Sequence, residues 1–209
     1  MTTTRPDPAR TLDGETVRLR ALRHQDLPEL FAAIGHPAVF AGGWGGGPAA
    51  YRPDLDSWRE LMERYLQWDA GNVYAVCLRS DGDRIVGTST LGDFDLENGS
   101  AHIGWTAYAP EVWGTRVNAE AKRLLLGIAF EHGFERVRLQ ADVLNSRSRA
   151  AIERLGARAE GILRHTQRRA DGSWRDTAVY SVLREEWPEV RERLDARLAS
   201  SLDREDARS

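Results

Sequence analysis

The residues best suited to chemistry stand where a strand-like segment ends and a helical pattern begins. Segment 105–130 reads WTAYAPEVWGTRVNAEAKRLLLGIAF, and its loop, 111–117, carries Trp113 and Gly114 directly before the helix. Backbone amides at a helix N-terminus carry partial positive charge, so this loop is a candidate seat for phosphate. It has one glycine, whereas dinucleotide fingerprints and Walker loops need two or three. Asn118 is the predicted N-cap of the helix.

Other patterns that often carry chemistry predict little here. The five histidines show no metal-ligand spacing, so no metal site is expected. The single cysteine, Cys77, stands in the apolar run 73–78 and is predicted to be a buried strand residue, not a nucleophile. The glycine-rich segment 41–50, AGGWGGGPAA, lacks the strand and the Lys-Ser/Thr pair of a phosphate loop. It is predicted to be a flexible surface loop, with a mobile lid over a cleft as the alternative.

Hydrophobic periodicity predicts the elements that must position these residues. The predicted strands are 16–22, 73–79, 84–91, 101–108, 136–143, 161–169 and 174–183, and the predicted helices are 27–34, 55–66, 117–130, 146–155 and 185–198. Simple alternation on strand 101–108 would place Ala101, Ile103, Trp105 and Ala107 on one face and His102, Gly104, Thr106 and Tyr108 on the other. The order of elements favours an α+β (mixed α/β) fold with about seven strands, not a repeated βα array.

Composition is that of one globular domain. The chain has 209 residues, of which 41% are hydrophobic and 29% charged, enough to bury one core. A net charge of −3 argues against general nucleic-acid binding. The polar N-terminus carries no signal-peptide pattern, and no segment is long enough to span a membrane, so a cytoplasmic protein is expected. Residues 1–13 are expected to be flexible.

Taken together, several of these motifs resemble the GNAT superfamily of acyl-CoA-dependent N-acyltransferases, and within it the branch of ribosomal-protein N-terminal acetyltransferases. The resemblance spans residues 14–187 as a single domain, followed by a C-terminal helix and polar tail at 188–209. It implies a central, mostly antiparallel sheet flanked by helices. The stretches that carry it are 15–23 (ETVRLRALR); 103–105 (IGW) with 113–114 (WG) and 118–121 (NAEA); 145–149 (NSRSR) with 153–157 (ERLGA); and 161–169 with Asp171-Gly172 and Arg175-Asp176.

The resemblance implies acetyl-CoA as cosubstrate, with no metal. In the family, backbone amides of the loop before the helix bind the pyrophosphate, and the preceding strand supplies the donor to the thioester carbonyl. Arg116 would add charge to the phosphates, or is a solvated loop arginine. Val117 replaces a small residue of the family pattern, and Asn145 matches an asparagine that contacts the pantetheine arm while also capping a helix. The implied cofactor-binding residues are Trp105, Thr106, Val112, Trp113, Gly114, Thr115, Arg116, Val117, Asn118, Asn145 and Ser148.

The resemblance also implies direct acetyl transfer to a primary amine, either a protein N-terminus or a small molecule. His102 occupies the place of a family glutamate and is the candidate base, since its ordinary pKa of about 6.5 suits the task. Asp93, Asp95 and Glu97 are alternative carboxylates. Ser148 is the candidate acid for the leaving thiolate, or an ordinary helix serine. The rival function is a non-catalytic acyl-CoA-binding module. The apolar stripe of helix 185–198 serves either a homodimer or the chain's own sheet.

Overall fold

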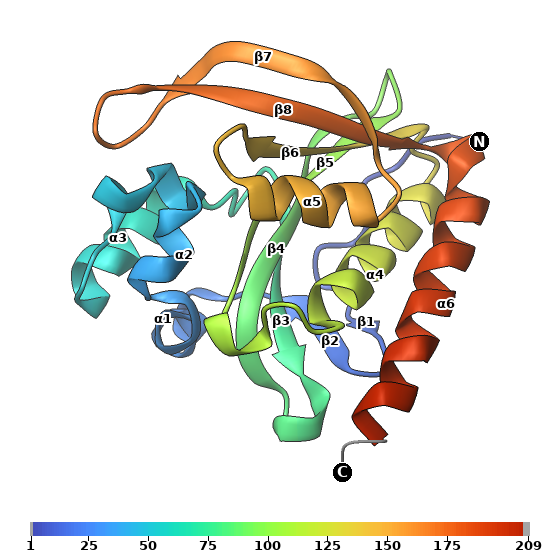
Figure 1. The fold of residues 1–209 in the computed structure, drawn as a ribbon, viewed down its shortest axis with the longest axis horizontal. Coiled ribbons are helices and arrows are strands. Elements are labelled where there is room, and N and C mark those ends of the chain that lie inside the picture. The colour runs from blue at the N-terminus through green and yellow to red at the C-terminus, as the bar shows by residue number, and fades with distance from the viewer. Residues whose placement is uncertain (1, 207–209) are drawn as a thin grey trace.

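The computed structural model describes residues 2–206, which form one curved sheet with helices on both sides (Figure 1). The strands are β1 (Leu12–Asp13), β2 (Val17–Ala21), β3 (Asn72–Leu78), β4 (Arg84–Asp95), β5 (Ser100–Tyr108), β6 (Arg136–Asp142), β7 (Arg158–Arg168) and β8 (Trp174–Leu183). The α-helices are α1 (Leu27–Ile34), α2 (Pro37–Ala41), α3 (Leu55–Tyr65), α4 (Val117–Glu131), α5 (Ser146–Arg154) and α6 (Trp187–Asp206).

The sheet confirms the predicted mixed α/β class. Its strand order is β1-β2-β3-β4-β5-β6-β8-β7, and β5 with β6 is the parallel pair in an otherwise antiparallel sheet. The sequence predicts about seven strands, and residues 2–206 form eight. The added strand is β1, whose two residues pair with Arg18 and Leu19 and are too few to show alternation.

The one parallel pair holds together at only one end. β5 and β6 pair from Ser100 with Arg136 to His102 with Arg138, and the pairing stops there. β5 runs on to Tyr108 and β6 to Asp142, so the two strands separate beyond this point. Strands that diverge leave backbone donors and acceptors without ladder partners, which a ligand can use. The fold therefore opens the sheet beside Trp105 and Thr106.

A β-bulge in β5 lies at the same opening. Thr90 pairs with Gly104 and Thr88 with Ala107, so Trp105 and Thr106 together oppose Ser89. Trp105 has a φ of 51°, which is strained for an aromatic residue. The extra residue shifts the alternation, and the predicted division of strand faces is wrong past Gly104. Ala107 packs with α1 and α3, whereas Tyr108 packs with α4.

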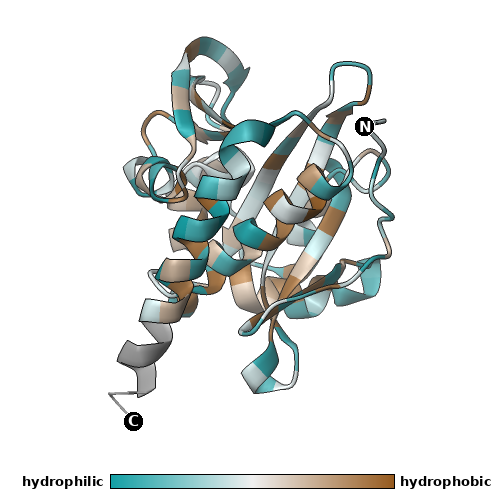
Figure 2. Ribbon diagram, turned by 90° about the vertical axis from the view of Figure 1, so that its right-hand side faces the viewer, coloured by the Kyte–Doolittle hydropathy of each residue, from teal (hydrophilic) through white to brown (hydrophobic). Residues whose placement is uncertain are grey.

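The helices bury the two faces of the sheet in two apolar clusters. One cluster joins the sheet to α4, α5 and α6, and the other joins it to α1, α2 and α3 around the fully buried Trp58. Val190, Leu194 and Leu198 of α6 are buried in the first cluster, where each stabilises the fold by roughly 1.5–3 kcal/mol. Hydrophilic bands lie along the outer side of α6 (Figure 2). The apolar stripe of this helix thus packs within the chain and is not an exposed interface.

The N-terminal segment does not behave as the sequence predicts. Arg5 donates from Nε to Oδ1 of Asn72 at 3.0 Å and from Nη2 to the carbonyl of Gly71 at 3.0 Å. The amide of Thr4 donates to the carbonyl of His132 at 3.0 Å, and Leu12 is buried. Residues 2–13 are therefore held against the domain, because polar side chains anchor them where apolar periodicity is lacking. Within residues 2–206, no helix has the length and apolar character that crossing a membrane requires.

Candidate active site

A cavity of about 510 Å³ occupies the opening between β5 and β6. Its floor includes Thr106 of β5 and Gln140 of β6. One wall is the loop around Gly114 together with α5, and the other is the glycine-rich loop together with the β7–β8 hairpin. Of the residues named from sequence as cofactor-binding, nine line this cavity: Trp105, Thr106, Val112, Trp113, Gly114, Thr115, Asn118, Asn145 and Ser148.

The loop before α4 has the shape of an anion seat. Gly114 has a φ of 78°, and a Cβ there would meet no atom within 4 Å, so glycine is favoured by its backbone conformation and not by lack of space. Thr115 donates from Oγ1 to the carbonyl of Val112 at 2.7 Å, which tightens the turn. Helix α4 starts at Val117, with Arg116 as N-cap and no side-chain cap bond. The predicted N-cap, Asn118, is wrong: this residue lies one position inside the helix.

Arg116 and Val117 do not face the cavity. The Arg116 side chain is 3% exposed and donates from Nη2 to Glu15 at 2.9 Å, on the far side of the helix start. The prediction that Arg116 meets phosphate is therefore wrong, because a carboxylate from the segment before β2 already holds it. Val117 is buried in the apolar cluster under α4. Its bulk consequently does not narrow the phosphate loop.

His102 and Asp93 form a hydrogen-bonded pair at the cavity. Nδ1 of His102 lies 3.0 Å from Oδ2 of Asp93, and the histidine is 2% exposed. Gln67 donates to the other oxygen of Asp93 at 2.9 Å, and Arg138 donates to Oδ2 at 2.8 Å. The carboxylate thus accepts a hydrogen bond from the Nδ1–H of a neutral imidazole, which leaves Nε2 as an acceptor. Nε2 is buried and has no hydrogen-bond partner in the described chain.

The electrostatics keep His102 neutral near pH 7. Burial lowers its pKa below the ordinary 6.5, and the hydrogen bond to Asp93 opposes this only in part. The pKa of Asp93 falls to about 2, chiefly because His102 and Gln67 donate to its carboxylate. An unprotonated imidazole held by an ionised carboxylate is the arrangement that general-base catalysis uses.

The other carboxylates proposed from sequence lie elsewhere. Asp95 accepts from the backbone and side-chain amides of Asn98 at 2.9 and 2.8 Å, so it closes the turn between β4 and β5. Glu97 is exposed in that turn. Neither residue lines the cavity. Asp93 does not line the cavity either, but of the three candidates it alone reaches the site, through its hydrogen bond to His102.

Helix α5 brings three polar residues to the cavity. Asn145 caps the helix by accepting from the amide of Ser148 at 2.9 Å, and its Nδ2 donates to the carbonyl of Gly42. Ser148 lines the cavity one turn into the helix. The guanidinium of Arg147 lies 3.6 Å from the centroid of the Trp113 ring, which closes the space between α5 and the loop before α4. Arg147 was not singled out from sequence, since one arginine in an Arg-rich helix carries no signal.

Lys122 is a further residue that sequence reasoning missed. It is 5% exposed, lines the cavity from α4, and donates from Nζ to Ser89 at 2.9 Å and to Thr106 at 2.5 Å. Burial lowers its pKa to about 7. Helical spacing contains a signal, because Lys122 stands three and four residues before the buried Leu125 and Leu126 and so occupies the apolar stripe.

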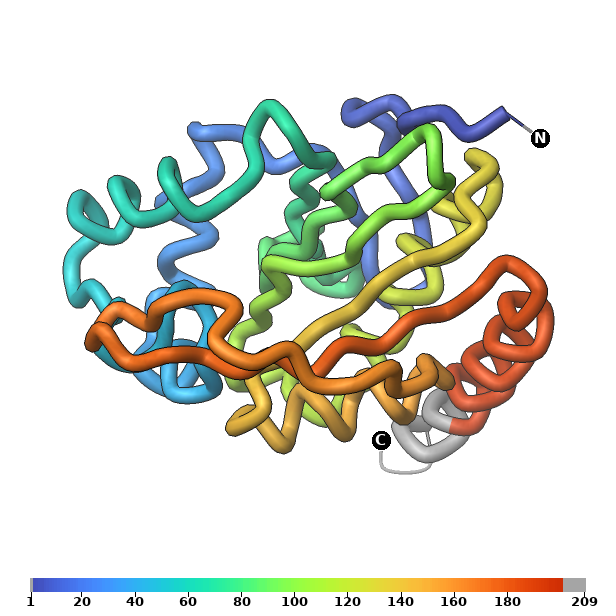
Figure 3. The backbone as a smooth tube through the Cα atoms, turned by 90° about the horizontal axis from the view of Figure 1, so that it is seen from above, coloured from blue at the N-terminus to red at the C-terminus, as the bar shows by residue number. Residues whose placement is uncertain are grey.

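The glycine-rich loop and the hairpin meet over the opposite wall. The amide of Ala170, at the hairpin turn, donates to the carbonyl of Gly46 at 2.9 Å. Seen from above, the end of the hairpin lies over part of the blue N-terminal helical segment (Figure 3). Gly43 has a φ of 91°, and a Cβ there would lie 3.3 Å from Asp142. The loop predicted to be a surface feature is therefore a wall of the cavity, and glycine lets it approach β6 closely.

Comparisons with known proteins agree with this geometry. The family model described as Acetyltransferase (GNAT) domain matches residues 16–158. A Bacillus subtilis (strain 168) protein named "Putative ribosomal N-acetyltransferase YdaF" is 30% identical over 83% of this chain and 94% of its own length. The crystal structure of a GCN5-related N-acetyltransferase from Brucella melitensis superposes with a TM-score of 0.83 at 29% identity, covering 94% of this chain and 88% of that one.

A third relative bears on the fold alone. The structure of Mycobacterium smegmatis RimJ in complex with CoA-disulfide superposes with a TM-score of 0.70 at 23% identity, covering 88% of this chain and 90% of that one. The shared architecture extends over nearly the whole domain.

Proposed function

Because this chain belongs to the GNAT family of acetyltransferases, we propose that it moves an acetyl group from acetyl-CoA directly to a primary amine within a ternary complex. The observation that carries the proposal is the single cavity in which an anion-seating helix N-terminus, a divergent strand pair and a neutral histidine meet. No acyl-enzyme is invoked, since Cys77 is buried in β3 with its pKa raised to about 11 by burial.

Three parts of acetyl-CoA, the pyrophosphate, the thioester carbonyl and the pantetheine arm, would each bind a different set of cavity residues. The amides around Gly114 and Thr115 would bind the pyrophosphate, and Arg147 would add charge beside them. The unpaired edge of β5 at Trp105 and Thr106 would donate to the thioester carbonyl, which develops negative charge during attack. Asn145, held by Gly42, would contact the pantetheine arm.

His102 is the proposed base for the attacking amine. Its Nε2 is a buried acceptor without a partner in the described chain, and a buried unsatisfied acceptor is destabilising. A donor N–H from the acceptor amine, or from one bridging water, would satisfy it. The ring of Trp105 lies 5.1 Å from that of His102 between centroids, and Trp105 packs against the apolar cluster of α1 to α3. The amine would therefore enter from the side of α3 and the glycine-rich loop, opposite to α4.

Replacing Asp93 with asparagine is expected to lower kcat by up to roughly 10²-fold without weakening acetyl-CoA binding. The substitution keeps the volume but removes the charge that fixes the tautomer and orientation of His102. Asp95→Asn is the matched control, since this carboxylate stays in the neighbouring turn. Steady-state kinetics at saturating acetyl-CoA measure the effect, and equal losses in both variants would contradict an orienting role for Asp93.

A proton must also return to the leaving thiolate. Ser148, which lines the cavity from α5, is the proposed donor. Lys122 reaches the same cavity through Thr106, and its pKa of about 7 lets it hold or release a proton near neutrality. A charged Lys122 would stabilise the developing thiolate even if the proton comes from Ser148.

The test of the proposed function is release of free thiol from acetyl-CoA in the presence of a pool of primary amines. We expect release that depends on both the amine and the intact protein. Thermal stabilisation by acetyl-CoA without any amine-dependent thiol would contradict catalysis and favour a non-catalytic acyl-CoA-binding module.

A further inference from the structure

At the end of the cavity under the β7–β8 hairpin, two arginines share one carboxylate among the described residues. Arg175 lines this end, and its side chain is 15% exposed. The nearest carboxylate is Asp142, whose Oδ2 lies 4.0 Å from Nε of Arg175. Burial lowers the pKa of Arg175, as expected for a guanidinium that is removed from water.

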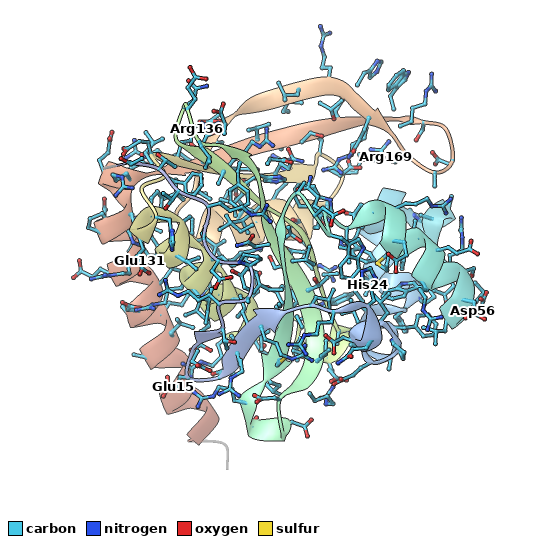
Figure 4. The ribbon with its side chains drawn as sticks, turned by 180° about the vertical axis from the view of Figure 1, so that it is seen from behind. Glu15, His24, Asp56, Glu131, Arg136 and Arg169 are labelled. Carbon is cyan, nitrogen blue, oxygen red and sulfur yellow. The ribbon has the colours of Figure 1, made fainter. Side chains whose placement is uncertain are left out.

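Asp142 is already fully engaged by another arginine. Arg169 donates to its two oxygens from Nε and Nη2, each at 2.9 Å, in a bidentate pair. The amide of Leu144 donates to the same carboxylate at 2.9 Å. Arg169 lies beneath the hairpin, between it and the helical segment (Figure 4). One carboxylate thus serves two guanidinium groups, and one positive charge is left over.

Two further neighbours of Arg175 are neutral, Gln167 and Tyr65. With its amide oriented so that the oxygen faces Arg175, Gln167 accepts from Nε at 3.2 Å. Tyr65 of α3 lies close by and lines the same end of the cavity, with Trp44 packed against it at 5.2 Å between ring centroids. A partly dehydrated guanidinium is a strong site for a carboxylate, because the bidentate pair forms with little competing water.

This charge lies apart from the groups that suit the cofactor's phosphates. The phosphate seat is formed by Gly114 and Thr115, with Arg147 beside it on α5. Arg175 belongs to β8 and faces the glycine-rich loop and α3, the side from which the acceptor amine would enter. The surplus charge is therefore available to the acceptor.

We propose that Arg175 selects acceptors whose primary amine is accompanied by a carboxylate, which binds Arg175 while the amine is acetylated. The inference rests on the proposed acetyl transfer and names its substrate class. The carboxylate comes either from an acidic residue near a peptide N-terminus or from the α-carboxylate of a free amino acid. Asp142 and Arg169 position the hairpin, and Arg175 makes the contact.

The experiment compares matched acceptor pairs that differ only in charge. One pair is a short peptide amide with Glu or Gln at its second position, and the other is a free amino acid and its amide. We expect the wild-type protein to favour the carboxylate member of at least one pair by about 10-fold or more in kcat/KM, since hydrogen bonds to charged groups are strong. Which pair responds identifies the source of the carboxylate.

Arg175→Gln is expected to reduce that preference, measured as the ratio of kcat/KM within each pair, to near unity. Arg175→Lys, which keeps the charge but loses the bidentate fork, should retain part of the preference. Arg164→Gln is the matched control, because Arg164 is exposed on the same hairpin and lies outside the cavity. Circular dichroism and Tm establish that each variant is folded.

Calorimetric binding of the same acceptors in the presence of CoA separates this proposal from the proposed function. If no amine is acetylated, the function fails, and the binding preference still decides the role of Arg175. Equal binding and equal rates within both pairs, or a preference that survives in Arg175→Gln, would overturn the proposal.

Discussion

Replacing His102 with glutamine is expected to lower kcat by roughly 10²- to 10⁴-fold while the Kd for acetyl-CoA changes little. General-base catalysis contributes a rate factor of this size, and glutamine cannot take a proton from the amine. Glutamine nearly preserves the volume and can still donate to Asp93, so the packing around this 2% exposed side chain should survive. Stopped assays of thiol release at saturating acetyl-CoA give kcat, and calorimetry gives the Kd.

The pH profile adds a second readout for His102. Its pKa lies below 6.5 in the folded protein, so the imidazole is unprotonated at pH 7 and becomes protonated only as the pH falls through that lower value. The acidic limb of the kcat profile that belongs to His102 should therefore lie below pH 6.5 and disappear in His102→Gln. His132→Gln is the control, since His132 bonds Thr4 at the end of α4, away from the cavity. Unchanged kcat in His102→Gln would exclude it as the base.

Long, periodic elements could be predicted from sequence, and short or irregular ones could not. Helix α4 begins at Val117 and β8 spans Trp174–Leu183, as the apolar spacing indicates. Helix α2 has five residues and begins at Pro37, too few to establish a period. The bulge at Trp105 left no signal in residue type, since it arises from how β4 and β5 pair. That bulge decides which side chains reach the opening.

The parts of the site formed by backbone amides could be predicted from sequence. The direction in which a side chain points, toward the cavity or away from it, could not. Gly114 and Thr115 line the cavity as expected because a loop before a helix fixes where its amides point. Arg116 turns to Glu15, a contact across 101 residues of sequence that no local pattern encodes. Asp93 and Asp95 read alike in the sequence, and only the strand register puts Asp93 beside His102.

The buried Lys122 is expected to affect both the free energy of unfolding and the rate of acetyl transfer. The pKa of Lys122 is about 7 in the folded protein and near its ordinary 10.5 in the unfolded chain. Between these values the unfolded state binds more protons, so the free energy of unfolding should rise as the pH increases from 7 toward 10. Below pH 7 the buried ammonium is destabilising, by roughly 3–5 kcal/mol relative to a neutral group.

Lys122→Met should therefore stabilise the protein by about 2–4 kcal/mol at pH 6, with a gain that shrinks toward pH 10. Methionine fills similar space, and Ser89 and Thr106 still bond each other at 2.8 Å, so neither hydroxyl is left without a partner. Urea unfolding at pH 6, 8 and 10 measures the gain. A gain that is equal at all three pH values would contradict titration of Lys122 near neutrality.

The rate of acetyl transfer by the same variant shows whether Lys122 takes part in catalysis. If the ammonium stabilises the thiolate beside Thr106, Lys122→Met should gain stability at pH 6 and lose turnover, with acetyl-CoA still bound. Lys122→Arg keeps a charge but cannot be deprotonated, so it should restore part of the thiolate stabilisation and none of the pH-dependent proton release. A more stable Lys122→Met with full turnover would mean that Lys122 contributes neither thiolate stabilisation nor proton release to the reaction.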